Sequence, residues 1–233
     1  MTVRALFFDV FGTLVDWRSG VLGELRAMGQ ARGVEADWQA IADGWRDRYL
    51  PILQSVNAGE RAWADLDVLH RATLDDVLGA QGVAGLGDED RERLVGAWHR
   101  LDTWPDTRAG LERLRSRFVL ATLSNGHVAL LVDLARRNDL RFDAILSAQM
   151  RGLYKPHAEV YRHGAELLGV APGEAMMVAA HPGDLLAARA AGLRMAFVRR
   201  VRERGPGGPV AVAPDGVDAA GDDLVAVAGA LGA

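Results

Sequence analysis

Short apolar segments recur along the chain, and most of them stop at a small or polar residue. The first covers residues 5–8 and stops at Asp9. Four more follow after residue 100, at residues 118–123, 142–146, 175–180 and 193–198. Each has the length of a strand, and a continuous apolar run indicates a strand that is buried on both faces.

Segments with helical periodicity separate these strands, at residues 107–114, 128–138, 158–168 and 185–191. Buried strands that alternate with helices predict an α/β fold with a Rossmann-like parallel sheet, covered on both faces. Residues 18–100 differ, because their apolar positions follow helical spacing and include no convincing strand. We therefore predict an α/β core domain at 1–17 and 101–233, with an inserted all-helical cap domain at 18–100.

Composition excludes several classes of protein. The 233 residues are 49% hydrophobic and 25% charged, with a formal net charge of −4, which is ordinary for a globular protein and gives no basic surface for nucleic acid. The absence of cysteine excludes disulfides, thiolate metal sites and a cysteine nucleophile. No secretory signal or membrane-spanning segment is evident, so we expect a cytoplasmic protein.

Polar side chains cluster where the predicted strands end. They are Asp9 and Thr13, Ser124 and Asn125, His181 and Asp184, and Lys155 in a loop after the third strand. Because ligands bind beyond the carboxyl ends of parallel strands, we expect these groups to converge on one site. A strand-end carboxylate can act as a covalent nucleophile, and a nearby lysine would keep it ionised. The alternative is that Asp9 and Lys155 form a structural ion pair and Ser124 caps a helix.

Four motifs resemble those of the haloacid dehalogenase superfamily, in the same order and at similar spacing across the chain. The motifs are Asp9-Val10-Phe11-Gly12-Thr13-Leu14-Val15, Ser124-Asn125-Gly126, Lys155-Pro156, and Gly183-Asp184 with the small residues that follow it. The superfamily's phosphatases carry a second aspartate at the position of Phe11, where it transfers protons. Because phenylalanine cannot transfer a proton, Phe11 argues against phosphoryl transfer.

An aromatic residue at this position is instead similar to the type II L-2-haloacid dehalogenases. Trp45-Arg46 and Tyr154-Lys155-Pro156, followed by Tyr161, are also similar to that family. The resemblance implies hydrolysis of short (S)-2-haloacids to (R)-2-hydroxyacids through an ester on Asp9. It also implies that the reaction needs no metal or other cofactor.

The resemblance assigns a role to each matching residue. Thr13 and Lys155 would hold the Asp9 carboxylate, and Asp184 would orient Lys155 or the hydrolytic water. Arg46 and Asn125 would stabilise the departing halide. The remaining predicted contacts with substrate come from four residues: Val10, Phe11, Ser124 and Tyr161.

His181 departs from the family pattern, because it stands where many members have an asparagine that positions water. A histidine can do the same, act as a base, or bond Asp9 or Lys155. Gly183 stands where a bulky aromatic is usual. The other histidines considered, at positions 70, 99, 127, 157 and 163, are interpreted as surface or cap residues, since no pair has the spacing of zinc ligands.

Three functions remain open from the sequence. The first is a 2-haloacid dehalogenase acting on a small-molecule substrate, with no nucleic-acid or membrane partner. The second is a magnesium-dependent phosphatase with Asp9 and Asp184 as metal ligands. The third is a non-catalytic binder of small carboxylates. The family resemblance also makes a homodimer an expectation.

Overall fold

A computed structural model describes residues 2–233. Its parallel sheet contains six strands in the described chain, in the order β3-β2-β1-β4-β5-β6. The strands are β1 (Ala5–Phe8), β2 (Val119–Ser124), β3 (Ala144–Ser147), β4 (Ala175–Ala179), β5 (Arg194–Val198) and β6 (Ala219–Gly221). The α/β fold expected from the alternating pattern is therefore confirmed.

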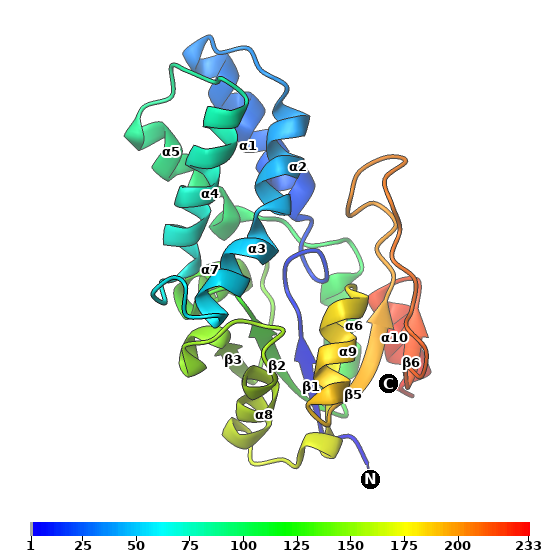
Figure 1. The fold of residues 1–233 in the computed structure, drawn as a ribbon. Helices are drawn as coiled ribbons and strands as arrows, with labels where there is room; N and C mark the ends of the chain where they lie inside the picture. Colours follow the sequence, from blue (N-terminus) through cyan, green and yellow to red (C-terminus); the bar gives the residue numbers. More distant parts are fainter. Residues whose placement is uncertain (1) are drawn as a thin grey trace.

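Helices cover both faces of this sheet. In Figure 1, α8 and α9 lie on the near face, and α6, α7 and α10 lie on the far face. These helices are α6 (Thr107–Arg115), α7 (Val128–Arg137), α8 (Ala158–Leu167), α9 (Pro182–Ala190) and α10 (Leu224–Ala230). Strands β1 and β4 are buried at every position, as continuous apolar runs predict.

The segment between β1 and α6 forms a separate helical layer above the carboxyl ends of the strands (Figure 1). It contains α1 (Trp17–Arg32), α2 (Trp38–Asp47), α3 (Tyr49–Asn57), α4 (Leu66–Ala80), α5 (Asp88–Val95) and the 3-10 helix η1 (Gly96–Arg100). No strand occurs between residues 17 and 100, all of which the structure describes. The exact domain boundaries proposed from the sequence stay a prediction.

An aromatic cluster packs the helical layer against the core. Trp98 of η1 lies at its centre, stacked on Trp17 with ring centroids 6.1 Å apart, and it meets the edges of Trp45 and Phe11 at 5.5 Å each. Such pairs contribute about 0.5–1.5 kcal/mol each beyond the area they bury. Phe11 follows β1, so this cluster fixes the helical layer directly over the end of that strand.

Strand β6 and helix α10 were not expected from the sequence. The short strand Ala219–Gly221 and the helix Leu224–Ala230 consist of alanine, glycine, valine and leucine, whose pattern is too brief to indicate either element. Asp106 explains their placement, since it accepts from Leu224 N–H at 2.7 Å and pairs with Arg200 at 2.6 Å. Among residues 2–233, no helix combines the length and apolarity needed to cross a bilayer.

Candidate active site

Asp9 follows directly after β1, at the middle of the sheet edge. Strand β1 pairs with β2 on one side and β4 on the other, so the residue that follows it is surrounded by other strand ends. The Thr13 hydroxyl donates to Asp9 Oδ2 at 2.7 Å, and Lys155 Nζ donates to Oδ1 at 3.0 Å. The carboxylate is thus held at both oxygens while 8% of the residue stays exposed.

The loop after Asp9 depends on a glycine. Gly12 has a φ of +87°, in the region that side-chain-bearing residues avoid. A Cβ at this position would lie 2.3 Å from Glu203 Oε1, which is shorter than the contact distance of non-bonded heavy atoms. The loop therefore turns back toward the sheet and brings Thr13 beneath the carboxylate.

Lys155 joins two carboxylates. Its Nζ lies 3.0 Å from Asp9 Oδ1 and 2.6 Å from Asp184 Oδ2, and the Tyr161 hydroxyl donates to Asp184 Oδ1 at 2.6 Å. Asn125 holds the lysine backbone on both sides, since its Oδ1 accepts from Lys155 N–H at 2.7 Å and its Nδ2 donates to Lys155 O at 3.3 Å. The motifs identified in the sequence therefore meet through direct hydrogen bonds.

The burial and charges of this group shift the pKa values of Asp9 and Asp184 in opposite directions. Burial favours the neutral form of Asp9, but the attraction of Lys155 and the hydrogen bond with His181 outweigh it, so the pKa of Asp9 lies below its usual range. Burial raises the pKa of Asp184, and the nearby charge of Asp9 adds to that effect. Burial opposes the charge of Lys155, yet the two carboxylates raise the pKa of the lysine overall. Asp9 is thus the better ionised carboxylate at neutral pH.

His181 lies between two carboxylates. Its Nδ1 is 3.2 Å from Asp9 Oδ2, and its Nε2 is 2.8 Å from Glu203 Oε1. Burial lowers the pKa of His181, but the hydrogen bonds to Asp9 and Glu203 outweigh it and raise the pKa from 6.5 to about 9. Glu203 also accepts from Trp17 Nε1 at 3.1 Å, and although burial raises the pKa of Glu203, the bond from His181 brings it down to about 2. His181 is therefore an imidazolium at neutral pH.

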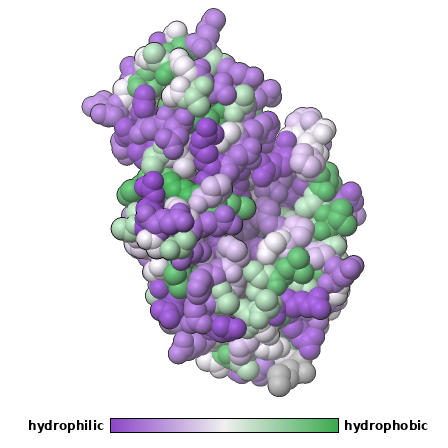
Figure 2. All heavy atoms as spheres, in the orientation of Figure 1, coloured by the Kyte–Doolittle hydropathy of each residue, from purple (hydrophilic) through white to green (hydrophobic). Residues whose placement is uncertain are grey.

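A pocket of about 350 Å³ opens over these groups, between the helical layer and the strand ends. Figure 2 shows hydrophilic residues gathered at the waist between the two parts of the molecule. Arg46 of α2 enters the pocket from above, with its guanidinium 4.4 Å from the ring centroid of Tyr49 and 5.3 Å from that of Trp17. Its Nη1 is buried and has no hydrogen-bond partner in the described chain. A buried cationic donor without a partner suits a bound anion.

Most of the side chains predicted for the site lie on this pocket: Asp9, Phe11, Arg46, Asn125, Lys155, Tyr161, His181 and Asp184. Thr13 lies behind Asp9 and acts through it. Val10 and Ser124 are buried, and neither is among the residues that line the pocket. The Ser124 hydroxyl accepts from Gly126 N–H at 3.2 Å within the turn between β2 and α7, so it does not cap that helix. Substrate contacts of Val10 and Ser124 stay predictions.

Several residues that were not expected line the pocket: Asp47, Tyr49, Leu50, Gln54 and Arg204. Glu203 was not expected either, and it acts on the pocket through its bond with His181. Glu203 and Arg204 belong to the loop between β5 and β6, which rises beside α2 in Figure 1. Arg204 pairs with Asp47 of α2 at 3.2 Å, so the loop contacts the helical layer. This loop has no periodicity, and its glycines indicate only a turn, so the sequence carried no signal for either residue.

The chain is similar to known haloacid dehalogenases. Residues 3–192 match a family described as haloacid dehalogenase-like hydrolase. (S)-2-haloacid dehalogenase 4A of Burkholderia cepacia is 32% identical over 79% of this chain and 78% of its own length. A crystal structure of a defluorinating L-2-haloacid dehalogenase superposes with a TM-score of 0.95 at 38% identity, covering 99% of this chain and 96% of the other.

A second solved structure bears on the chemistry. The L-2-haloacid dehalogenase of Xanthobacter autotrophicus, solved with chloropropionic acid covalently bound, superposes with a TM-score of 0.83 at 25% identity. The superposition covers 97% of each chain.

Proposed function

Because the chain belongs to the family of haloacid dehalogenase-like hydrolases, we propose that it hydrolyses the carbon–halogen bond of short (S)-2-haloacids. The products are halide and the (R)-2-hydroxyacid. One observation carries the choice within the family: the ionised Asp9 faces a pocket that also holds Phe11 and the unpartnered guanidinium of Arg46. The pocket thus offers a nucleophile and an anion site, with no proton donor where a phosphatase needs one.

The reaction has two steps. In the first, a carboxylate oxygen of Asp9 forms a bond to C2 of the substrate, and the halogen leaves with the electron pair of the carbon–halogen bond. Attack from the side opposite to the halogen inverts C2. In the second, water adds to the carbonyl carbon of the Asp9 ester, and the C2–O bond stays intact while the acyl bond breaks. The hydroxyacid leaves and the carboxylate of Asp9 is restored.

Arg46 supplies the charge that the first step requires. Halide develops negative charge as it leaves, and the Nη1 of Arg46 has no competing partner in the described chain. The rings of Tyr49 and Trp17 fix the guanidinium plane without neutralising it. Stabilisation of developing charge by a fixed donor contributes about 3–4 kcal/mol in comparable sites.

His181 changes its acidity during the cycle. In the free enzyme Asp9 and Glu203 together keep it protonated, and this cation helps hold the nucleophile ionised. Formation of the ester removes the charge of Asp9, so the pKa of His181 falls toward neutrality. The imidazole then becomes a base of suitable strength for the water that attacks the ester, and Glu203 keeps its ring in place.

We propose that this chemistry proceeds without a metal in the pocket. The ammonium of Lys155 occupies the place between Asp9 and Asp184, where it already balances both carboxylates. A substrate with a single carboxylate needs no divalent ion to screen phosphate oxygens. We further propose that the enzyme acts in the cytoplasm as a homodimer, independent of nucleic acid; light scattering after size exclusion measures the oligomer directly.

The decisive experiment measures halide release from L- and D-2-chloropropionate separately, with and without EDTA. We expect release from the L isomer, unchanged by EDTA, and none from Asp9→Asn. Release of phosphate from p-nitrophenyl phosphate that stops on chelation would instead identify a phosphatase. Binding of short acids in a thermal-shift titration, without turnover of either substrate, would identify a carboxylate binder.

A further inference from the structure

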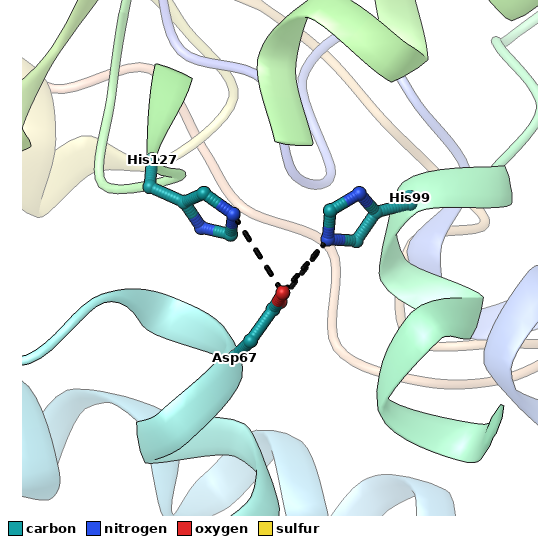
Figure 3. Close-up of side chains that lie close together, drawn as sticks. All are labelled: Asp67, His99 and His127. Carbon is teal, nitrogen blue, oxygen red and sulfur yellow. Dashed lines mark hydrogen bonds and ion pairs between the residues drawn. The ribbon is translucent and has the colours of Figure 1, made fainter. Parts of the chain in front are cut away.

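Two histidines and an aspartate converge on the side of the molecule where the helical layer meets α7. Asp67 lies in the first turn of α4, His99 in η1, and His127 at the N-terminus of α7 (Figure 3). His99 Nε2 lies 3.0 and 3.2 Å from the two carboxylate oxygens of Asp67, and His127 Nε2 lies 3.6 Å from Oδ2. Each of the three residues offers one ligand atom, and these three atoms all lie within 4.8 Å of one another.

The spacing of these atoms suits an ion of the size of zinc. Zinc bonds nitrogen and oxygen at about 2.0–2.2 Å, so tetrahedral ligand atoms lie about 3.3 Å from one another. The contacts of Asp67 with His99 and His127, at 3.0 and 3.6 Å, lie on either side of that value. Small side-chain adjustments would bring all three atoms onto one ion, with water as a fourth ligand.

Two neighbouring features support a ligand at this place. Asp133 of α7 accepts from His99 Nδ1 at 2.7 Å. A metal-bound imidazole commonly has such a carboxylate partner on the ring nitrogen that does not bind the metal. His127 is nine-tenths buried, and neither of its ring nitrogens has a hydrogen-bond partner in the described chain, since the 3.6 Å between Nε2 and Asp67 Oδ2 is longer than a hydrogen bond. Although it begins α7, its side chain caps no backbone N–H of that helix. The structure thus buries an imidazole beside a carboxylate and gives it no other role.

We propose that Asp67, His99 and His127 bind a divalent transition-metal ion of the zinc, cobalt or nickel class. Two imidazoles with one carboxylate are borderline ligands that suit these ions, whereas magnesium and calcium prefer oxygen alone. The ion would join α4 and η1 to α7 and so fasten the helical layer to the core. This site is separate from the haloacid pocket, since none of its three ligands lines that pocket.

The position of His127 gives the ion a route to influence the pocket. His127 comes two residues after Asn125, which lines the pocket and holds the backbone of Lys155. A metal at this joint would restrain the helical layer above the pocket, so it acts on stability and on substrate entry, and has no part in bond breaking. The inference does not depend on which substrate the pocket accepts.

The test is a titration of the metal-free full chain with Co²⁺, recorded by visible absorption, and with Zn²⁺, recorded by calorimetry. We expect one ion per chain, and the visible d–d bands that cobalt gives with nitrogen and oxygen ligands. His127→Ala and Asp67→Asn should each abolish the bands and weaken zinc binding by at least about 10-fold. Circular dichroism of both variants checks that they fold.

His163→Ala is the matched control. His163 pairs with Glu166 at 3.2 Å, so it presents a partly buried histidine beside an exposed carboxylate, without a third ligand in the described chain. Its loss should leave the cobalt spectrum and the zinc affinity unchanged. Zinc should also raise the melting temperature of the wild type but not of folded His127→Ala.

Three results would overturn the proposal. One is the absence of cobalt bands and of saturable zinc binding in the wild type, which would make the cluster an ion-pair network bridged by a proton. Another is binding that survives both ligand substitutions. The third is binding that disappears in the His163 variant, which would place the ion on the surface.

Discussion

Replacement of Glu203 by glutamine tests the proposed role of His181 most directly. The amide keeps the size of the side chain, and its oxygen can still accept from Trp17 Nε1 and His181 Nε2. What disappears is the negative charge 2.8 Å from the imidazole. Neither Asp9 nor the pocket lining changes, so the nucleophile stays intact.

The structure sets the size of the expected effect. Asp9 and Glu203 together raise the pKa of His181 from 6.5 to about 9 against the cost of burial. Loss of one of these two partners should lower the pKa of His181 in the free enzyme by about 1–2 pH units. In the ester intermediate Asp9 is already neutral, so in the variant burial acts unopposed and holds the pKa of His181 below 6.5.

Rapid-quench kinetics over a pH series separates the two steps. Halide release reports the attack of Asp9, and appearance of the hydroxyacid reports hydrolysis of the ester. We expect the midpoint of the acidic limb of hydrolysis to move down by about 1–2 pH units in Glu203→Gln. The plateau rate should also fall, because a weaker base takes up the proton less readily, while halide release in the first turnover changes little.

Asp47→Asn is the control for this experiment, because Asp47 also lines the pocket but pairs with Arg204 instead of His181. In Asp47→Asn, the midpoint of the acidic limb of ester hydrolysis should be the same as in the wild type. An unchanged midpoint in Glu203→Gln would refute the reasoning, as would an equal shift in both variants. Either result would mean that His181 only positions water and does not accept its proton.

Four other outcomes follow from the same geometry. Asp9→Asn should lower halide release on the order of 10⁴-fold or more while circular dichroism shows an intact fold, since only the nucleophile's charge is lost. Lys155→Met should cost about 3–5 kcal/mol in urea unfolding, because two buried carboxylates lose their shared cation, and a loss under 1 kcal/mol would contradict this. Arg46→Lys should reduce the rate of halide release by about 10–100-fold, measured in the first turnover, because a lysine lacks the fixed planar donor; an unchanged rate would exclude Arg46 as the halide site. His181 has a raised pKa in the folded state, so its contribution to stability is complete below pH 6.5 and is lost as pH rises through about 9; thermal unfolding across this range should show a decline that His181→Asn lacks.

The residues at the strand ends could be predicted from the sequence. Asp9, Asn125 and Lys155 lie on separate segments, yet their convergence was predictable because parallel strands place their carboxyl ends along one edge. Asp184 follows the same rule, as it lies in the first turn of the helix after β4. These predictions needed only local patterns, namely apolar runs of strand length followed by polar residues.

The partners of His181 were beyond that reasoning. Glu203 is 22 residues away in a loop without periodicity, and what fixes that loop is contact with distant segments. Glu203 bonds Trp17, and Arg200 donates to Thr13 O at 2.9 Å and pairs with Asp106. Loops are positioned by such long-range contacts, which no local pattern records.

The burial of the histidines also depends on long-range contacts that local sequence patterns do not record. Of the histidines interpreted as surface or cap residues, His70 lies on α4, within the segment expected to form the cap, although it is buried there. His127 is buried outside that segment, at the start of α7, so the interpretation is wrong for it. His70 stacks on Trp98 with ring centroids 4.2 Å apart, because the aromatic cluster accepts a neutral imidazole as an apolar ring. Burial lowers the pKa of His70 and keeps it neutral there.

The amino-acid sequence by itself determined the α/β core, the helical segment above it, the nucleophile and the residues at the strand ends. Each of these depends on periodicity or on a short motif, both of which are local properties of the chain. Only the tertiary structure decided which charges surround His181, that Glu203 bonds both His181 and Trp17, and that Asp67, His99 and His127 meet. These depend on how helices and loops from distant segments pack, and packing is a property of the whole folded chain.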